Sequence, residues 1–327
     1  MRDTKFYFLT LVCLTLAFSA VGAQRDSVDV RIAFGSSDDY LKAKMESNAS
    51  TLLTILKNAA HDKKEPKFPD NIMTEDTEMK IKEMWKSSRI ECIYNEIRTN
   101  CLNTSYGDLQ IRNIPVIFTA ASEETKNEEI SLNFNKQGLI NDINITIKLH
   151  QYESIFGNSE VVEDIVNRNK ILDFIEKFRT AYNCKDIEYL ENVYSNNALI
   201  INAVERKIRQ IPNSDQPLKS LGEKQYDFQV KSKAEYIAAL KKVFKKNSFI
   251  NIIFDSIEVL EHPGFENIYG VTLKQHWNSE SYNDVGYLYL LIDCTKEYEM
   301  QVFVRAWSPD QLFDFNSFGD IKFHDSK

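Results

Sequence analysis

The sequence has little glycine, proline or cysteine for its length. Of its 327 residues, 10 are Gly, 7 are Pro and 5 are Cys. This composition excludes collagen-like, low-complexity and wholly disordered chains. Because 43% of the residues are hydrophobic and 27% are charged, the chain has the composition of a globular protein, and its length predicts two domains.

A surplus of positive charge is also missing. The chain carries 40 Lys and Arg against 48 Asp and Glu, which gives a formal net charge of −8. Proteins that bind duplex nucleic acid normally carry excess basic residues that neutralise phosphates. We therefore expect no nucleic-acid partner.

The common catalytic and cofactor motifs are absent. The sequence contains no GxGxxG, P-loop, GxSxG, HExxH or CxxC pattern. The histidines are scattered without the spacing of metal ligands: His61, His150, His262, His276 and His324. We expect no cofactor and no metal site, and we assign no catalytic residue.

The amino terminus has the pattern of a signal peptide. Arg2 and Lys5 precede an apolar run over residues 6–18, and the small residues Gly22 and Ala23 follow. The run is shorter than the roughly 20 residues that span a bilayer, and no later segment is apolar enough. The pattern predicts cleavage after Ala23 and an exported, periplasmic or secreted protein whose mature chain has no transmembrane segment. The alternative is an uncleaved anchor.

Four cysteines remain after this cleavage, and they allow three disulfide pairings. They are Cys92, Cys101, Cys184 and Cys294. If Cys92 and Cys101 lie on one straight strand, their separation forbids a bond. Buried thiols and a single structural disulfide both fit the sequence, so the oxidation state stays open.

The first half of the mature chain predicts an α+β domain over residues 39–155, after a flexible arm over residues 24–38. Apolar residues recur at helical spacing from Tyr40 to Ala60, and Thr74 is a candidate cap for a second helix. Extended segments follow at 90–102 and 109–119. A hairpin is then predicted around Gly138.

The second half, residues 160–327, repeats this order of helices and antiparallel strands. Asp186 is a candidate helix cap, and Ser232 with Glu235 forms a capping box for a helix that ends near Lys246 in a cluster of lysines. We interpret those lysines as a solvated helix end. Strands are predicted at 249–260, 268–277, 286–293 and 299–307, and the aromatic tail after Pro309 is expected to pack on the domain.

The segments Phe178–Asp186 (FRTAYNCKD), Val271–Trp277 (VTLKQHW) and Tyr282–Leu288 (YNDVGYL) resemble nuclear-transport-factor-2-like (SnoaL-like) domains of exported bacterial proteins. The resemblance covers about residues 160–310. It implies a cone formed by a curved sheet wrapped on helices, and such domains are often dimeric. The amino-terminal unit resembles a cystatin-like fold more weakly. The family hosts isomerases, dehydratases and binding modules, so the resemblance implies the fold better than the function.

Two strands of the second half predict a binding face. If Leu273 lies opposite Leu290, one sheet face is aliphatic and should form the core. The opposite face then carries aromatic and cationic side chains, which are typical of binding surfaces. The candidate binding residues on this face are His276, Tyr287, Tyr289, Arg305 and Trp307. Cover by the first unit or by a second copy of the chain is the alternative reading of this face.

These observations predict an exported, non-catalytic binding or interaction module of the periplasm or cell envelope. A homodimer, an envelope protein and a small-molecule ligand are the partners considered. The alternative is a small-molecule enzyme of the isomerase or hydrolase type that uses the cone. That alternative needs a carboxylate or histidine with a perturbed pKa in a real cavity. Asp284, predicted to lie in a turn between two strands, is not assigned this role.

Overall fold

The computed structural model describes residues 27–35, 38–104, 108–120, 123, 125–148, 151, 155–156, 162–206, 224–295 and 300–318. The predicted signal peptide and the histidines at 150 and 324 lie outside these residues. The described chain is of the α+β class, as expected from the sequence. No described helix is long and apolar enough to cross a membrane.

The first half combines two helices with short and long strands. Its elements are β1 (Asp29–Ile32), α1 (Asp39–Asp62), α2 (Glu75–Ser87), β2 (Ser88–Glu91), β3 (Glu96–Thr99), β4 (Cys101–Asn103), β5 (Leu109–Ala120), β6 (Thr125–Phe134) and β7 (Ile140–Ile145). The extended segment expected at 90–102 is thus broken into three short strands. Cys92 and Cys101 therefore do not share one straight strand.

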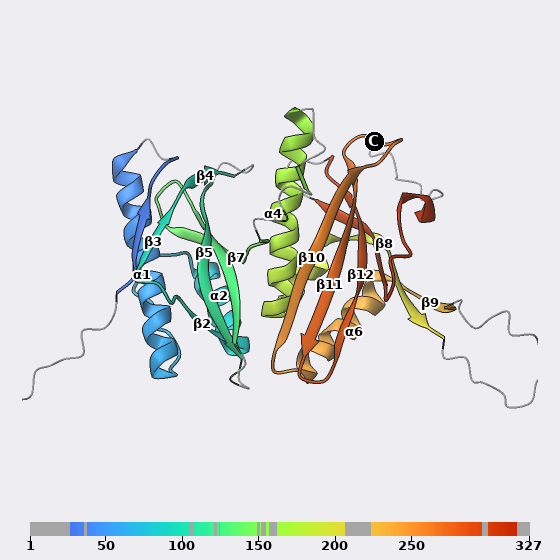
Figure 1. Cartoon of the computed structure of the whole chain (residues 1–327), viewed down its shortest axis with the longest axis horizontal. Helices are drawn as coiled ribbons and strands as arrows, with labels where there is room; N and C mark the ends of the chain where they lie inside the picture. The colour runs from blue at the N-terminus through green and yellow to red at the C-terminus, as the bar shows by residue number, and fades with distance from the viewer. Residues whose placement is uncertain are drawn as a thin grey trace, which may run out of the picture.

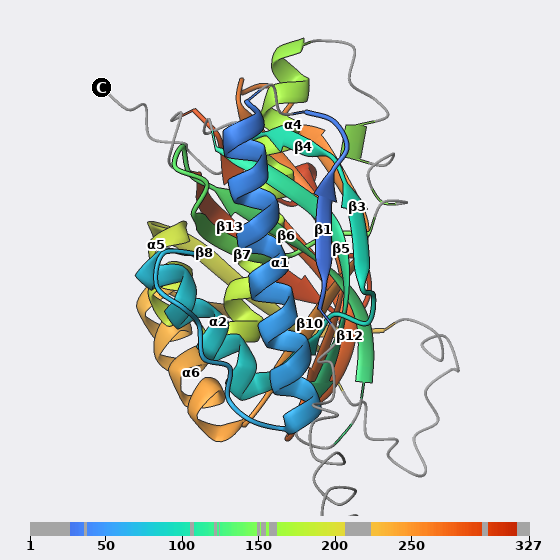
Figure 2. The same cartoon turned by 90° about the vertical axis from the view of Figure 1, so that its left-hand side faces the viewer.

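One antiparallel sheet organises this half, in the order β2-β5-β6-β7, with β4 also paired to β5. Helix α1 packs across the apolar face of the sheet (Figure 2). The arm expected at residues 24–38 is partly ordered instead, because β1 pairs in parallel with β3. Its buried side chains Val30 and Ile32 join the core under α1, which explains the order.

The second half begins with two helices and continues mainly as sheet. Its elements are α4 (Val162–Cys184), α5 (Ile187–Val193), β8 (Tyr194–Glu205), β9 (Tyr226–Lys231), α6 (Lys233–Lys246), β10 (Ile250–Glu261), β11 (Ile268–Ser279), β12 (Asn283–Asp293), β13 (Gln301–Ser308) and the 3₁₀ helix η2 (Phe315–Phe318). The strands form one sheet in the order β10-β11-β12-β13-β8-β9. Its concave face packs on α4 and α6 (Figure 1).

The helix starts follow the capping signals of the sequence. The side chains of Thr74, Asp186 and Ser232 accept backbone N–H groups at the starts of α2, α5 and α6, and the capping box with Glu235 is complete. The hairpin at Gly138 is also confirmed, between β6 and β7. Each cap satisfies amide groups that a helix start leaves without partners.

Helix α4 stands between the two sheets (Figure 1). Its apolar side chains, among them Phe174 and Phe178, belong to the core of the second half. On its other side, Glu176 and Thr180 hydrogen bond to the backbone of the first half at Ile147 and Ile145. The helix is therefore buried on two sides, one apolar and one polar.

The cysteines at 92, 101, 184 and 294 are all buried free thiols. Burial raises the pKa of the Cys184 thiol to about 12, and that of Cys294 to the same value. Nucleophilic attack needs the thiolate, so these groups are chemically inert at neutral pH.

Candidate ligand-binding cavity

A cavity of about 540 Å³ lies in the second half, between α6 and the concave face of the sheet. Side chains from β8, β9, α6, β11, β12 and β13 line it. This volume falls within the range of about 300–1,000 Å³ that is common for small-molecule sites. The cone is therefore hollow at this end, while its other end is filled by the core around Phe178.

Arg305 lies at the wall of the cavity, although only 5% of the residue is exposed. Its Nη1 donates a hydrogen bond of 3.2 Å to Oδ1 of Asn202 on the neighbouring strand β8. Its guanidinium carbon lies 5.0 Å from the ring centroid of Tyr236, in a cation–π geometry. Strand β13 and helix α6 thus position this cation together.

Three tyrosine hydroxyls meet next to Arg305. The hydroxyl of Tyr182 lies 3.0 Å from that of Tyr194 and 2.5 Å from that of Tyr236. Burial raises the pKa of Tyr182 and Tyr194 far above the usual value, so both phenols stay neutral. Because the tyrosines come from α4, β8 and α6, their hydrogen bonds join three elements at the wall of the cavity.

Two indole rings supply the aromatic part of the lining, Trp277 on β11 and Trp307 on β13. The indole ring of Trp307 packs directly against the backbone of Gly286 on β12. A Cβ atom at that position would come within 2.6 Å of the indole ring. Glycine at position 286 is therefore a packing requirement of the cavity wall.

Asp284 also lines the cavity, which corrects the expectation that it lies in a turn. Strand β12 starts at Asn283, and Asp284 pairs with Trp277 across the β11–β12 ladder. Burial raises the pKa of its carboxyl group, although the Tyr282 hydroxyl and the charge of Arg305 act in the opposite direction. The same surroundings raise the pKa of Tyr282 to about 12.

Three buried polar atoms of the lining residues have no hydrogen-bond partner among the described residues. They are Nε of Arg305, Nε1 of Trp307 and Oδ1 of Asp284. Buried polar groups are nearly always paired in folded proteins, because an unpaired group loses its hydration without compensation. Three such atoms belong to residues that line one cavity, and all three are enclosed within its wall.

The structure divides the five binding residues predicted from the sequence between two faces. Leu273 lies opposite Leu288 rather than Leu290, a difference of two residues that keeps the faces of β11 and β12 as expected. Strand β13, however, carries an irregularity. Val302 pairs with Ile292 and Val304 with the adjacent Leu291, so Phe303 is an extra residue.

This bulge reverses the alternation in the rest of β13. Arg305 pairs with Leu290 and Trp307 with Leu288, so both lie on the concave face rather than on the opposite face as predicted. Val304, expected on the core face, lies on the convex face with Ala306. Arg305 and Trp307 are thus brought together at the cavity, and the other three predicted residues are not.

His276, Tyr287 and Tyr289 lie on the convex face of the sheet, as their pattern predicted. Tyr289 is buried there beneath the carboxy-terminal segment, and its ring stacks on Phe318 with centroids 5.4 Å apart. This packing confirms, for the described residues up to 318, that the aromatic tail folds back on the domain. A shared binding face of all five residues is therefore wrong.

Sequence reasoning missed several lining residues, among them Asn202, Tyr236, Trp277 and Asp284. Trp277 is four residues from Leu273, and Asp284 is four residues from Leu288. Side chains an even number of residues apart on a strand share a face, so the sequence could have placed both on the concave face. Asn202 and Tyr236 gave no local signal, because only the parallel pairing of β13 with β8 and the packing of α6 bring them to Arg305.

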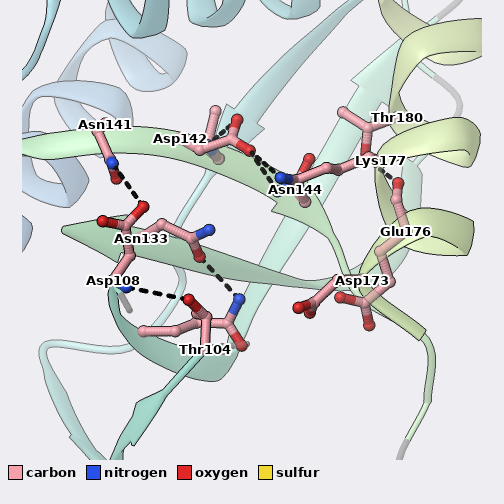
Figure 3. Close-up of polar contacts among 12 residues, drawn as sticks. Thr104, Asp108, Asn133, Asn141, Asp142, Asn144, Asp173, Glu176, Lys177 and Thr180 are labelled. Atoms are coloured by element: carbon pink, nitrogen blue, oxygen red, sulfur yellow. Dashed lines mark hydrogen bonds and ion pairs between the residues drawn. The ribbon is translucent and has the colours of Figure 1, made fainter. Parts of the chain in front are cut away.

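A second polar region lies between the first sheet and α4, and Figure 3 shows its side chains facing one another across the gap. Lys80 donates to Asp142 at 2.7 Å and to Asn144 at 2.9 Å, and Lys177 lies 3.8 Å from Asp142. Burial raises the pKa of Asp142, but the two lysines outweigh it, and the pKa is lowered. Lys80, Asp142 and Lys177 line a cavity of about 290 Å³.

Deeper in this interface the ions are also paired. Arg112 contacts Glu176 at 2.5 Å, and Arg179 contacts Glu128 at 2.7 Å while donating to the carbonyl of Ile252. Arg179 therefore links β6 of the first sheet, α4 and β10 of the second sheet. The partners found for these charges indicate a structural role for the interface.

Within the described ranges, no group of His, Cys, Asp and Glu side chains is arranged to hold a metal ion. No protein-family model matches the sequence, and no curated protein matches it either.

Solved structures align with parts of the chain at low identity. A nuclear-transport-factor-2-like protein from Cytophaga hutchinsonii is 14% identical, with a TM-score of 0.31, over 43% of this chain and 97% of its own. A second protein of that kind, from Shewanella oneidensis, is 14% identical with a TM-score of 0.28, over 42% and 95%. The Bd1075 protein of Bdellovibrio bacteriovorus is 10% identical with a TM-score of 0.33, over 64% and 91%.

These neighbours include proteins of the fold that the sequence resembles, whereas the cystatin-like resemblance of the first half stays a prediction.

Proposed function

We propose that the chain is a binding protein that holds a small organic molecule in the cavity of its second half. The observation that supports this most is the cavity of about 540 Å³ itself, whose lining combines the rings of Trp277 and Trp307 with the polar side chain of Arg305. Such a mixture of apolar walls and a few convergent polar groups is typical of small-molecule sites. The signal-peptide pattern of residues 1–23 supports binding outside the cytoplasm.

The site differs from the outward-facing binding face, for a ligand or a partner, that was expected from the sequence. That expectation depended on Arg305 and Trp307 facing outward, and both side chains line the cavity instead. A small molecule is therefore favoured over a protein partner at these two residues.

The neutral dye N-phenyl-1-naphthylamine tests this proposal, because it fluoresces in apolar sites and accepts energy from tryptophan. Two of the three tryptophans, Trp277 and Trp307, line the cavity, so bound dye should quench their emission. The variant Ala239→Trp places a large ring on α6 in the lining and should abolish dye binding. Equal binding by this variant and the wild type would contradict the proposal.

A second candidate function, an enzyme of the isomerase or hydrolase type, is favoured by Asp284 alone. A carboxyl group whose pKa is raised by burial is a candidate general acid or base. Hydrolysis of 4-nitrophenyl acetate by the wild type, lost in Asp284→Asn while dye binding persists, would support this candidate. Identical rates for both proteins would contradict it.

A further inference from the structure

The buried arginines of the chain fall into two groups. Arg112, Arg168, Arg179 and Arg305 are each no more than 7% exposed. The first three contact the carboxylates of Glu176, Asp164 and Glu128, at 2.5, 2.8 and 2.7 Å. Arg305 has no carboxylate within 4.0 Å among the described residues, although Asp284 lines the same cavity.

The described groups in contact with Arg305 are neutral, and the carboxyl group of Asp284 interacts with it only over a longer distance. Its guanidinium hydrogen bonds to the amide of Asn202 and to the hydroxyl of Tyr182, and it lies over the ring of Tyr236. The phenols of Tyr182 and Tyr194 stay protonated. An arginine cannot lose its proton in a protein, so its charge remains buried. A buried charge is stable only when hydrogen bonds and a counter-charge replace its hydration.

The side chains that line the cavity also carry more positive than negative charge. Lys231, Lys246 and Arg305 line it against the single carboxyl group of Asp284, whose pKa is raised. Lys246 belongs to the lysine cluster at the end of α6, where it is exposed as expected from the sequence, and it also lines the cavity. Low-dielectric walls concentrate such a field and favour ligands of negative charge.

We propose that the cavity takes a small organic anion, whose charged group binds at Arg305 and whose apolar body lies against Trp277 and Trp307. This inference depends on the proposed binding function and adds the chemical class of the ligand. The charged group supplies the carboxylate or sulfonate oxygens that the guanidinium lacks. The rings of the two tryptophans supply apolar contact surface for the rest of the molecule.

Two dyes with the same aromatic skeleton, one anionic and one neutral, separate the effect of ligand charge from that of ligand shape. 1-Anilinonaphthalene-8-sulfonate is an anion, and N-phenyl-1-naphthylamine is the skeleton without the sulfonate. We expect the mature wild-type protein to bind the anion more tightly, measured by dye fluorescence and by quenching of tryptophan emission. In Arg305→Met, affinity for the anion should fall roughly 10- to 100-fold more than affinity for the neutral dye, because a hydrogen-bonded charge contact is lost.

Three further variants control this comparison. Arg206→Met removes an exposed arginine that pairs with Asp227 and should leave both affinities unchanged. Arg305→Lys keeps the charge, so it should retain part of the preference for the anion, and it serves if Arg305→Met does not fold. Ala239→Trp should abolish binding of both dyes, which places them in the cavity rather than on the apolar convex face.

The outcomes distinguish the two proposals. Failure of both dyes to bind, or binding that Ala239→Trp leaves unchanged, overturns the binding function itself. If both dyes bind in the cavity with equal affinity, and Arg305→Met weakens both equally, the cavity binds small molecules but the anionic class is wrong. A preference for the anion that disappears only in Arg305→Met supports the inference.

Discussion

The interface beside α4 and the cavity beside α6 differ in the partners of their buried arginines. At the interface, Arg112 and Arg179 are held by carboxylates, and Asp142 is held by two lysines. At the cavity, Arg305 has neutral neighbours and Asp284 keeps a raised pKa. Paired charges join parts of a structure, whereas at the cavity the proposed anion would supply the contact counter-charge that Arg305 lacks. The difference separates a structural region from a candidate site without any reference to sequence motifs.

The largest effect expected is on the interface. Arg112→Met removes the cation that faces Glu176 and Asp173 and leaves two carboxylates buried. Breaking a buried ion pair on one side typically lowers the free energy of unfolding by about 3–5 kcal/mol. Urea denaturation measures the change. The exposed variant Arg206→Met is the control. If both variants lose the same free energy of unfolding, the stability of the interface does not depend on its ion pairs.

The same substitution in the cavity should change stability much less. Arg305→Met replaces an arginine that has no carboxylate partner in the described part of the chain, and we expect unfolding free energy within about 1 kcal/mol of the wild type. The measurement is the same urea titration without added ligand. A loss as large as that of Arg112→Met would mean that Asn202 and the tyrosines already satisfy the guanidinium, and the contrast between the regions would disappear.

Two partly buried aspartates should change the stability in opposite directions when each is replaced by neutral asparagine. Because the folded state lowers the pKa of Asp142, its ionised form stabilises the fold above the unfolded pKa of about 3.9. Asp142→Asn should therefore lower the free energy of unfolding at pH 7 by about 1–3 kcal/mol, and by less as the pH falls below 4. Thermal melts from pH 7 to pH 3 follow this change.

Asp284→Asn is the matched variant in the cavity. The folded state raises the pKa of this carboxyl group, so its ionised form is penalised at pH values above the folded pKa. Asparagine should stabilise the protein at pH 7, and the gain should vanish below the unfolded pKa of about 3.9. If both variants changed the free energy of unfolding at pH 7 in the same direction, the two aspartates would not have opposite electrostatic surroundings.

The smallest effect is expected on the convex face. The hydroxyl of Tyr289 is buried without a hydrogen-bond partner among the described residues, and its ring packs under the carboxy-terminal segment. Tyr289→Phe should leave dye affinity unchanged and alter stability by at most about 1 kcal/mol, in the stabilising direction. Calorimetric melts and the dye titration measure both. A large loss of dye binding would place a ligand site on this face after all.

Local structure was largely predictable because its causes are local. The caps at Thr74, Asp186 and Ser232 depend on side chains within three residues of the helix start. The faces of β11 and β12 followed from alternation, which tolerates the two-residue difference in register at Leu273. Pairing of β1 with β3 was not predicted, because its partner strand lies more than 60 residues away and gives no local signal.

The candidate site was predictable only in part. Arg305 and Trp307 were identified as binding residues from their type, but the wrong face was assigned because the bulge at Phe303 has no mark in the sequence. Asp284 was assigned to a turn because β12 begins earlier than its apolar pattern indicates. In both cases the error came from strand pairing, which is decided by neighbours distant in the sequence.

By itself, the sequence determined the α+β class, the helix starts, the amphipathic faces of β11 and β12, and the absence of familiar catalytic motifs. These properties depend on composition and on contacts within a few residues. Only the tertiary structure decided that Arg305, Asn202, Tyr236 and Asp284 meet at one cavity, and that Arg112 and Arg179 receive carboxylate partners. The physical reason is that the environment of a buried charge is set by side chains from other strands and helices, and only folding brings these together.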